Sequence, residues 1–410
     1  MSQRRVVITG MGALSPVGNT TAETWQSLVA GRSGVGPLTH FDASDQDSKI
    51  AAELKGFQVE DHFDKRSARR MDPFVQYAIV AAREAVANAG LVIDDSNATR
   101  VGVVFGSGIG GIKAWDDNYH VLQERGAARV SPFLIPMLIG NMAAGMVSIE
   151  IGAQGPSKSV QTACATSANS AGDGFRLIQE GTVDAVVVGG SEAPIQPLAC
   201  AGFASMKALS TRNDDPTHAS RPFDRERDGF IMAEGAAALV LEDYDHARAR
   251  GATVLAEMVG YGQSSDAYHM AAPLPCGGGA ARAIRQALDE AGISPAEVGY
   301  INAHATSTGA GDSAEVAAMR QVFGDGLPPV SSTKSMTGHM LGAAGAMELI
   351  VCVMAIREGV LPPTTNYEHP DPECELDCIP NEAREARLEV AISNSFGFGG
   401  HNCTLAVRRV

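Results

Sequence analysis

The chain has 410 residues, of which 45% are hydrophobic and 19% are charged, a composition typical of a globular protein with a sizeable core. Its formal net charge of −15 makes nucleic acid an unfavourable partner. The longest apolar stretch, 343–356, is too short to cross a membrane and contains Glu348. The seven cysteines are scattered and odd in number, which predicts reduced thiols in a cytoplasmic compartment and no metal site.

Short apolar runs alternate with helical patterns along the chain. Strands are predicted at 6–9, 101–105, 185–188, 237–241, 253–259, 300–302, 390–393 and 404–407. Helices are predicted at 73–89, 167–180, 279–291, 313–323 and 342–358. Because most of the apolar runs are continuous rather than alternating, the strands should be buried on both faces of their sheets, as in an α/β fold.

Two halves are predicted, 1–250 and 251–410, because charged residues cluster at 243–252 after a strand. The halves share no obvious sequence identity. Segments 159–164 and 330–334 nevertheless both lead from a strand towards a helix of small residues. This shared arrangement is consistent with an ancient duplication.

The glycine-rich segment 106–111 follows a predicted strand and formally matches a dinucleotide-binding loop. Such a site also needs a helix that opens at the loop and an acidic residue at the next strand end. The charged residues from Lys113 to Asp117 follow instead, with no second strand at the right distance. We therefore expect a glycine-lined wall of a substrate channel, with Ile109 projecting into it.

Cys164 is the strongest candidate for a nucleophile. It lies where a small-residue helix should begin, and the free N–H groups and positive dipole of a helix start favour a thiolate. A lone buried cysteine is more often only a small hydrophobic residue. The case for chemistry therefore depends on other motifs further along the chain.

Two histidine motifs supply that case. His304 ends a predicted strand and is followed by Thr306 and Thr308, whose hydroxyls suit an amide-bearing ligand. His339 precedes an Ala/Gly-rich helix and follows Lys334 by five residues. A buried lysine needs a partner, and Glu348 is the expected carboxylate. Taken alone, each histidine could be purely structural.

The segment 394–402 carries glycines around aromatic residues, in the order Phe396, Gly397, Phe398, Gly399. Such a turn can aim backbone N–H groups at a ligand, although a plain hairpin would have a similar composition.

Together these motifs resemble the β-ketoacyl-acyl carrier protein synthases of the elongating, two-histidine kind, closest to type II. The resemblance runs from Val6 to Asn402 and includes the segments 208–211, 221–224 and 227–230. It implies a thiolase fold, with duplicated halves in a layered αβαβα arrangement, and a homodimer. It also implies a decarboxylative Claisen condensation of a cysteine-bound acyl chain with malonyl-ACP, which gives 3-oxoacyl-ACP, CO2 and free ACP in fatty acid elongation, with no cofactor.

The resemblance also assigns roles to single residues. Cys164 would be acylated, His304 and His339 would promote decarboxylation, and Lys334 would be the active-site lysine. Phe398, with Gly397 and Phe396, would form the gate, and the N–H groups of Cys164 and Phe398 would form an oxyanion hole. The substrate-binding set implied by the motifs is Ile109, Phe133, Thr306, Thr308 and Gly399.

This chain departs from the family pattern at three positions, where Ala305, Gly309 and His401 replace the common residues. Gly309 should loosen its loop, and His401 adds a titratable group beside the gate.

Three related activities compete with this interpretation. A thiolase would use a second cysteine near the C-terminus, where only Cys403 lies. An initiating synthase would have asparagine in place of His339, and a non-catalytic chain-length factor would lack Cys164. A ketosynthase of a specialised polyketide pathway shares the whole motif set and remains the main alternative.

The acyl carrier protein is acidic by the same resemblance, so an acidic enzyme needs a local basic patch to bind it. We predict this patch at Lys65, Arg66, Arg69, Arg70 and Lys207. A solvated helix end would show a similar run of charges.

Overall fold

The computed structural model describes residues 4–410. Ten strands form one continuous sheet in the order β10-β9-β13-β14-β8-β1-β7-β6-β4-β5. The strands of the first half are β1 (Val6–Leu14), β4 (Val101–Gly106), β5 (Ser157–Lys158), β6 (Ala185–Glu192) and β7 (Gly235–Asp243). Those of the second half are β8 (Ala256–Ser265), β9 (Tyr300–Asn302), β10 (Val330–Ser331), β13 (Val390–Gly397) and β14 (His401–Arg408). Two small pairs complete the strands: β2 (Gly36–Pro37) with β3 (Ile50–Ala51), and β11 (Val360–Leu361) with β12 (Arg384–Glu385).

The strand order is duplicated. In each half the first strand pairs antiparallel with the last, as β1 does with β7 and β8 with β14. Each last strand pairs antiparallel with the strand before it, β6 or β13, and that strand pairs parallel with β4 or β9. The short strands β5 and β10 then pair parallel with β4 and β9 at the two edges of the sheet. The halves join where Val6–Ile8 of β1 pair with Ala256–Met258 of β8.

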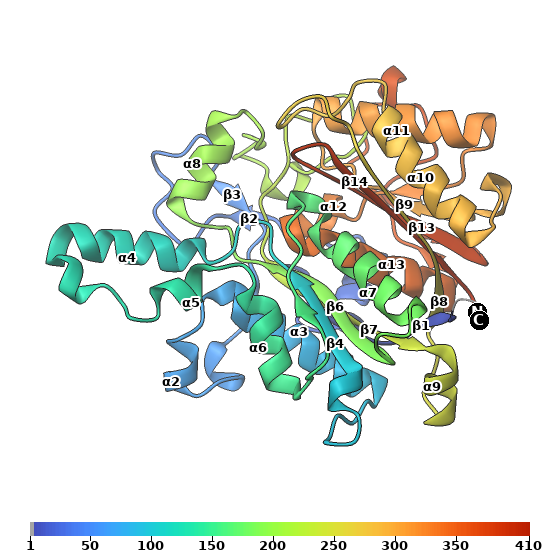
Figure 1. Cartoon of the computed structure of the whole chain (residues 1–410). Helices are drawn as coiled ribbons and strands as arrows, with labels where there is room; N and C mark the ends of the chain where they lie inside the picture. The colour runs from blue at the N-terminus through green and yellow to red at the C-terminus, as the bar shows by residue number, and fades with distance from the viewer. Residues whose placement is uncertain (1–3) are drawn as a thin grey trace.

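The helices fall into layers around this sheet (Figure 1). The longer ones are α1 (Thr21–Val29), α3 (Pro73–Ala89), α4 (Ile112–Arg125), α6 (Met142–Ile151), α7 (Thr166–Gln179), α8 (Pro197–Ser205), α10 (Gly278–Ala291), α11 (Gly309–Phe323) and α13 (Ala344–Glu358). The shorter ones are α2 (Lys65–Ala68), α5 (Leu134–Leu138), α9 (Tyr244–Ala249) and α12 (Lys334–Thr337). α3 and α6 pack on strands of the first half, and α10 packs on strands of the second and against α11. α7 and α13 contact strands of both halves and form the middle layer.

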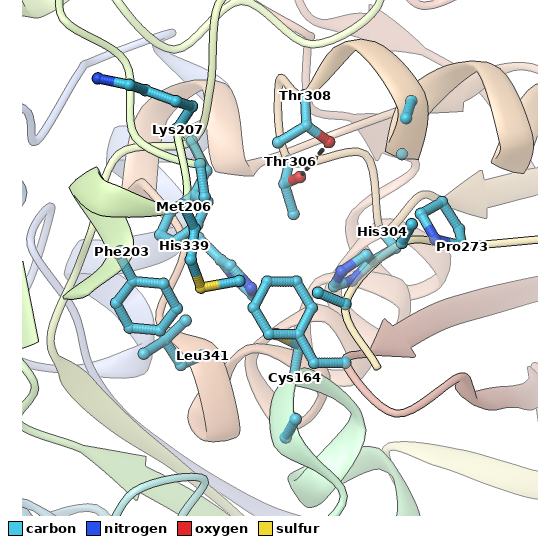
Figure 2. Close-up of a pocket in the computed structure, with 18 of the residues that line it drawn as sticks. Cys164, Phe203, Met206, Lys207, Pro273, His304, Thr306, Thr308, His339 and Leu341 are labelled. Atoms are coloured by element: carbon cyan, nitrogen blue, oxygen red, sulfur yellow. Dashed lines mark hydrogen bonds between the residues drawn. The ribbon is translucent and has the colours of Figure 1, made fainter. Parts of the chain in front are cut away.

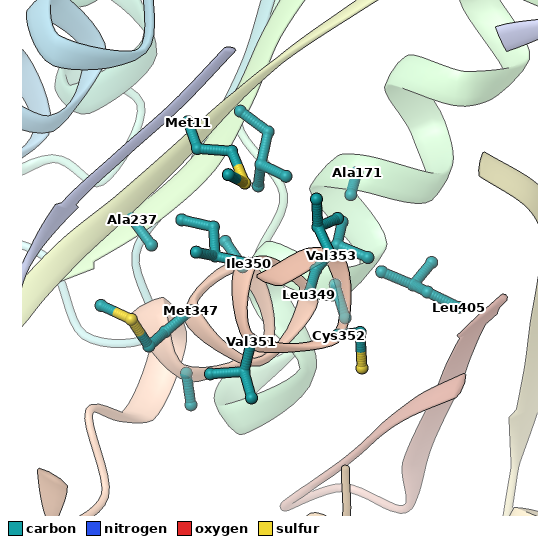
Figure 3. Packing of buried hydrophobic residues seen from close by; sticks show 14 of the residues in the cluster. Met11, Ala171, Ala237, Met347, Leu349, Ile350, Val351, Cys352, Val353 and Leu405 are labelled. Atoms are coloured by element: carbon teal, nitrogen blue, oxygen red, sulfur yellow. The ribbon is translucent and has the colours of Figure 1, made fainter. Parts of the chain in front are cut away.

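The middle layer is the centre of the core. Figure 3 shows α13 end-on, with Met347, Ile350 and Val353 among apolar side chains from β1, β7, α7 and β14. Burial on every side explains why this helix is apolar all round rather than on one stripe. This packing therefore fixes the start of α13 relative to the start of α7. His339 lies a few residues before the start of α13.

Glycines let the outer helices approach the first strand of each half directly. A Cβ at Gly12 would lie 2.0 Å from the carbonyl oxygen of Ala81 in α3. A Cβ at Gly262 of β8 would lie 1.9 Å from the carbonyl oxygen of Ala283 in α10. The same close contact at matching places in both halves supports the duplication that the sequence indicated.

The helices expected at 73–89, 167–180, 279–291, 313–323 and 342–358 are all present, with ends within a few residues. The division at residue 250 falls between β7 and β8, after α9, and stays a prediction. A helix does open at Ile112 directly after the glycine-rich loop, so the expectation that none would follow was wrong. Within residues 4–410, no helix combines the length and apolar character needed to cross a bilayer.

Candidate active site

Cys164 lies in a short 3-10 turn, η4 (Ala163–Ala165), that leads directly into α7. Ala163 has a left-handed φ of +49°, which turns the chain sharply just before the thiol. Two hydrogen bonds hold this turn. The Thr162 N–H donates to the Thr166 hydroxyl at 2.9 Å, and the Asn169 amide donates to the Thr162 hydroxyl at 2.8 Å. The turn thus presents the thiol at the N-terminal end of a central helix.

His304 follows β9 and is positioned by a carboxylate that no sequence motif indicated. Glu315 of α11 accepts hydrogen bonds from the backbone N–H groups of His304 at 2.9 Å and Ala305 at 2.7 Å. The amide of Asn394 in β13 donates to the same carboxylate at 3.1 Å. Burial raises the pKa of Glu315 to about 7, against these hydrogen bonds, which lower it. The backbone of His304 is therefore fixed from two neighbouring elements.

His339 is held by the segment that contains Phe230. Its N–H donates to the carbonyl of Ile231 at 2.7 Å, and its own carbonyl accepts from the N–H of Ala233 at 3.0 Å. The Phe230 ring meets the imidazole edge-to-face with centroids 5.4 Å apart. Phe230, noted only as part of the family resemblance, and the residues directly after it thus hold a histidine of the second half.

The fold brings Cys164, His304 and His339 together. The Sγ atom and one nitrogen of each imidazole all lie within 4.8 Å of one another. The two imidazole rings are nearly perpendicular, with centroids 5.3 Å apart. Both ring nitrogens of His339 and Nδ1 of His304 have no hydrogen-bond partner within the described chain. A thiol beside two free imidazole nitrogens can hold an acyl group and place two N–H donors on a nearby oxygen.

Burial and a nearby lysine keep both imidazoles neutral. Desolvation, followed by the charge of Lys334, lowers the pKa of each histidine well below its ordinary value. Lys334 is itself buried and donates to the carboxylate of Glu348, which is the contact expected from the sequence. Neutral imidazoles serve as hydrogen-bond donors through N–H groups without carrying a charge into the apolar site.

Burial raises the pKa of the Cys164 thiol to about 12, while the charge of Lys334 and the Phe398 backbone N–H favour the thiolate. The helix start was expected to be the dominant influence on this thiol. In the folded chain, desolvation opposes it and favours the protonated thiol.

The three groups lie at the base of a cavity of about 560 Å³. Figure 2 shows Cys164 at one end and the hydroxyls of Thr306 and Thr308 at the other, joined by a hydrogen bond of 3.1 Å. Ile109 and Phe398 also line the cavity, as expected. Lining residues that the sequence did not indicate are Phe203, Met206, Phe230, His269, Pro273 and Leu341. Most are apolar, which suits a hydrocarbon chain.

Not every predicted residue reaches this cavity. Phe133 lies instead under Arg70, whose guanidinium is 4.6 Å from the ring centroid, and they share a separate surface hollow with Lys65, Arg66 and Arg69. Lys207 lies at the cavity and pairs with Asp47, so the predicted basic patch is split between two places. Phe396 packs edge-to-face on His304, with centroids 5.9 Å apart. A Cβ at Gly397 would lie 3.1 Å from the Cys164 nitrogen, whereas Gly399 faces the His401 ring.

Among the described residues, the only group of metal-binding type is this same cluster of Cys164, His304 and His339. A thiolate and two imidazoles are ligands that zinc accepts.

Comparisons with known proteins agree with this geometry. Residues 3–247 match the family model "Beta-ketoacyl synthase, N-terminal domain", and residues 255–368 match "Beta-ketoacyl synthase, C-terminal domain". The chain is 52% identical over its full length to the 3-oxoacyl-[acyl-carrier-protein] synthase 2 of Synechocystis sp., of which 99% is covered. It is also 52% identical to the corresponding protein of Staphylococcus aureus strain N315, again over 100% of this chain and 99% of the relative.

Solved structures give the same picture. The ishigamide ketosynthase/chain length factor superposes with a TM-score of 0.93 at 37% identity and full coverage of both chains. A β-ketoacyl synthase from Burkholderia phymatum superposes with a TM-score of 0.92 at 37% identity, covering 99% of this chain and 100% of the other. The duplicated α/β architecture is the thiolase fold, as predicted. The chain belongs to the beta-ketoacyl synthase family.

Proposed function

We propose that this chain condenses an acyl group held on Cys164 with malonyl-ACP, which yields 3-oxoacyl-ACP, CO2 and free ACP in fatty acid elongation. The observation that carries the proposal is the thiol within 4.8 Å of two neutral imidazoles at the base of an apolar cavity. The family match and the 52% identity to 3-oxoacyl-ACP synthases 2 support the substrate class. The identity to a neighbour described as a type II PKS ketosynthase is lower, at 33%.

In the first half-reaction, the Cys164 sulfur attacks the acyl thioester. As the new thioester forms, the proton of the Cys164 thiol is transferred to the carrier sulfur, which departs as a free thiol. The backbone N–H groups of Cys164 and Phe398 would donate hydrogen bonds to the developing oxyanion, because the end of β13 lies against the cysteine turn. Burial of the sulfur favours the protonated thiol, whereas the charge of Lys334 and the Phe398 N–H favour the thiolate that attacks.

In the second half-reaction, the carboxylate of malonyl-ACP leaves as CO2 and the electron pair moves onto the thioester as an enolate. His304 and His339 donate N–H hydrogen bonds to the enolate oxygen, whose charge develops only as CO2 departs. The enolate carbon then attacks the acyl carbonyl on Cys164, and the sulfur leaves. Thr306 and Thr308, near the mouth of the cavity, suit the amide groups of the pantetheine arm. The scheme needs no cofactor.

Intact-protein mass spectrometry tests this function directly. Wild type and Cys164→Ala are incubated with acyl-ACP and then with malonyl-ACP. The expected result is an acyl adduct on wild type alone, cleared by malonyl-ACP as 3-oxoacyl-ACP appears. No adduct, or an adduct that malonyl-ACP does not clear, would move the assignment to a thiolase or a non-condensing subunit.

The carrier protein is proposed to dock on the cluster of Lys65, Arg66, Arg69 and Arg70. These side chains share one surface hollow on a chain whose net charge is −15. One of the related structures is described as a ketosynthase in complex with its acyl carrier protein. Charge reversal at Arg69 and Arg70 should raise KM for acyl-ACP and leave acyl-CoA unaffected. An equal effect on both substrates would refute the docking site.

We also propose that the chain forms a homodimer. The edge strand β5 is exposed, and apolar side chains gather on the segments before it, with Ile149 at 73% and Ile135 at 60% exposure. Light scattering should give twice the chain mass. The free cysteines fit a cytoplasmic setting.

A further inference from the structure

The glycine-rich loop that resembled a phosphate cradle holds an anion that belongs to the chain itself. Glu192, the last residue of β6, is fully buried beneath this loop. Its carboxylate accepts the N–H of Gly108 at 2.8 Å, the N–H of Ile109 at 3.1 Å and the hydroxyl of Ser107 at 2.7 Å. The converging N–H groups typical of a nucleotide-binding loop thus serve an internal carboxylate.

The same carboxylate also reaches the second half of the molecule. It accepts the N–H of Gly342 at 2.9 Å, in the 3-10 turn η8 (Leu341–Ala343) that leads into α13. A Cβ at Gly108 would lie 2.8 Å from the Glu192 Oε2 atom, and one at Gly342 would lie 2.6 Å from it. Both contacts are closer than real Cβ atoms approach, so glycine at each position is what allows the carboxylate to sit between the halves.

The duplication gives this arrangement a counterpart at the nucleophile. η8 leads into α13 as η4 leads into α7, and each turn begins with a left-handed residue, Leu341 at φ +45° and Ala163 at φ +49°. Gly342 therefore occupies in the second half the place that Cys164 occupies in the first. β13 ends against Cys164, and its equivalent β6 ends at Glu192 against Gly342.

Two walls of the acyl cavity depend on this carboxylate. Ile109 and Leu341 both line the cavity beside Cys164. Glu192 accepts the backbone N–H of Ile109 itself and that of Gly342, the residue after Leu341. We propose that Glu192 is a positioning residue that fixes these two walls and thereby sets the discrimination between acyl groups of different length. This inference rests on the proposed function, because it concerns the acyl group that Cys164 receives.

The chemistry of the site requires both carboxylate oxygens. Oε1 accepts from Ser107 and Ile109, and Oε2 accepts from Gly108 and Gly342. In a Glu192→Gln variant, the amide oxygen can keep both glycine N–H groups. The amide NH2 then faces the Ser107 hydroxyl, which can rotate to accept, and the Ile109 N–H, which has no acceptor left. The substitution therefore releases Ile109 selectively and leaves the tie to Gly342 in place.

The experiment compares wild type, Glu192→Gln, Ile109→Ala and the double variant. Cys164 acylation is followed by mass spectrometry with acyl-ACPs of several lengths, and CO2 release from malonyl-ACP is measured separately. For Glu192→Gln we expect the ratio of kcat/KM between the best and poorest acyl lengths to fall about tenfold, the size of one hydrogen bond to a charged group. CO2 release should stay unchanged. In the Ile109→Ala background, Glu192→Gln should alter the length profile no further.

A loss that is equal for all lengths and for CO2 release, or effects that add in the double variant, would overturn the proposal and leave Glu192 a purely structural residue. If Glu192→Gln does not fold, Ser107→Ala loosens the same loop on both sides of Ile109, because the Ser107 hydroxyl donates to Glu192 and accepts the N–H of Gly110 at 2.9 Å. It should shift the profile in the same direction, and an unchanged profile would contradict the proposal. Failure of the proposed function looks different, because wild type itself would then form no acyl adduct.

Discussion

Removing either histidine should slow decarboxylation far more than acylation. In the proposed reaction, His304 and His339 each offer one neutral N–H to the enolate oxygen. Each imidazole is buried, with 9% exposure for His304 and 3% for His339. Loss of one preorganised donor to a developing oxyanion typically costs about 2.7–4 kcal/mol, or about 10²- to 10³-fold in rate. We therefore expect His304→Ala and His339→Ala each to lose about that much of the rate of CO2 release.

The assay separates the two half-reactions. CO2 release is followed with carboxyl-labelled malonyl-ACP, and acylation of Cys164 is followed by mass spectrometry in the absence of malonyl-ACP. Acylation depends on the thiol and on the backbone N–H groups of Cys164 and Phe398, so it should fall much less than CO2 release in both variants. Asn169→Ala, which frees the Thr162 hydroxyl beneath the cysteine turn, is the matched control and should affect acylation first. Equal losses in both half-reactions of the histidine variants would refute this division of roles.

Four further outcomes are expected. Because the pKa values of His304 and His339 are lowered, both imidazoles stay neutral below pH 6.5. The rate of CO2 release should therefore show no decline centred at pH 6.5 when the pH is lowered from 8 to 6. Such a decline would contradict the proposal that neutral imidazoles act as the hydrogen-bond donors. Zinc should inhibit the enzyme by binding Cys164 and both histidines, and a chelator should restore activity. Prior acylation of Cys164 should protect the enzyme from zinc. Equal inhibition of the acylated enzyme would place the metal elsewhere. Burial raises the pKa of Glu242, but hydrogen bonds from Arg250, His246 and Thr9 outweigh burial and lower the pKa to about 2. The stabilisation from ionised Glu242 is therefore present above pH 4.5 and is lost as the pH falls towards 2. In denaturant unfolding, Glu242→Gln should lower the free energy of unfolding by about 3 kcal/mol at pH 7, and this difference should vanish at low pH. Gly12→Ala should destabilise the chain by about 3 kcal/mol or more in the same assay, since its Cβ meets a helix backbone that cannot move aside, whereas Gly36→Ala, with open space around it, should not.

Local signals were enough to predict some elements closely. Helix 73–89 was predicted with its observed bounds because Asp72 caps it, Pro73 begins it and Gly90 ends it in a left-handed conformation. Helix α4 was missed because only Ala114 is buried along it, so its apolar pattern is weak. In the glycine motif at 106–111, the N–H of Gly108 binds Glu192, a contact that the sequence did not predict, and the expectation that no helix would open there was wrong.

The sequence by itself determined the family, the duplicated α/β class and the identity of the thiol and the two histidines, because these depend on motifs within a few residues. Only the tertiary structure decided which residues hold them. Glu192 and Glu315 carry no local pattern, since the N–H groups that each accepts belong to loops brought near by strand pairing. The same is true of the Cys164 thiol, because its pKa is raised by burial and lowered by the charge of Lys334, which is distant in the chain. Desolvation and hydrogen bonding act over a few ångströms of space, whatever the separation in sequence, and so they appear only once the chain has folded.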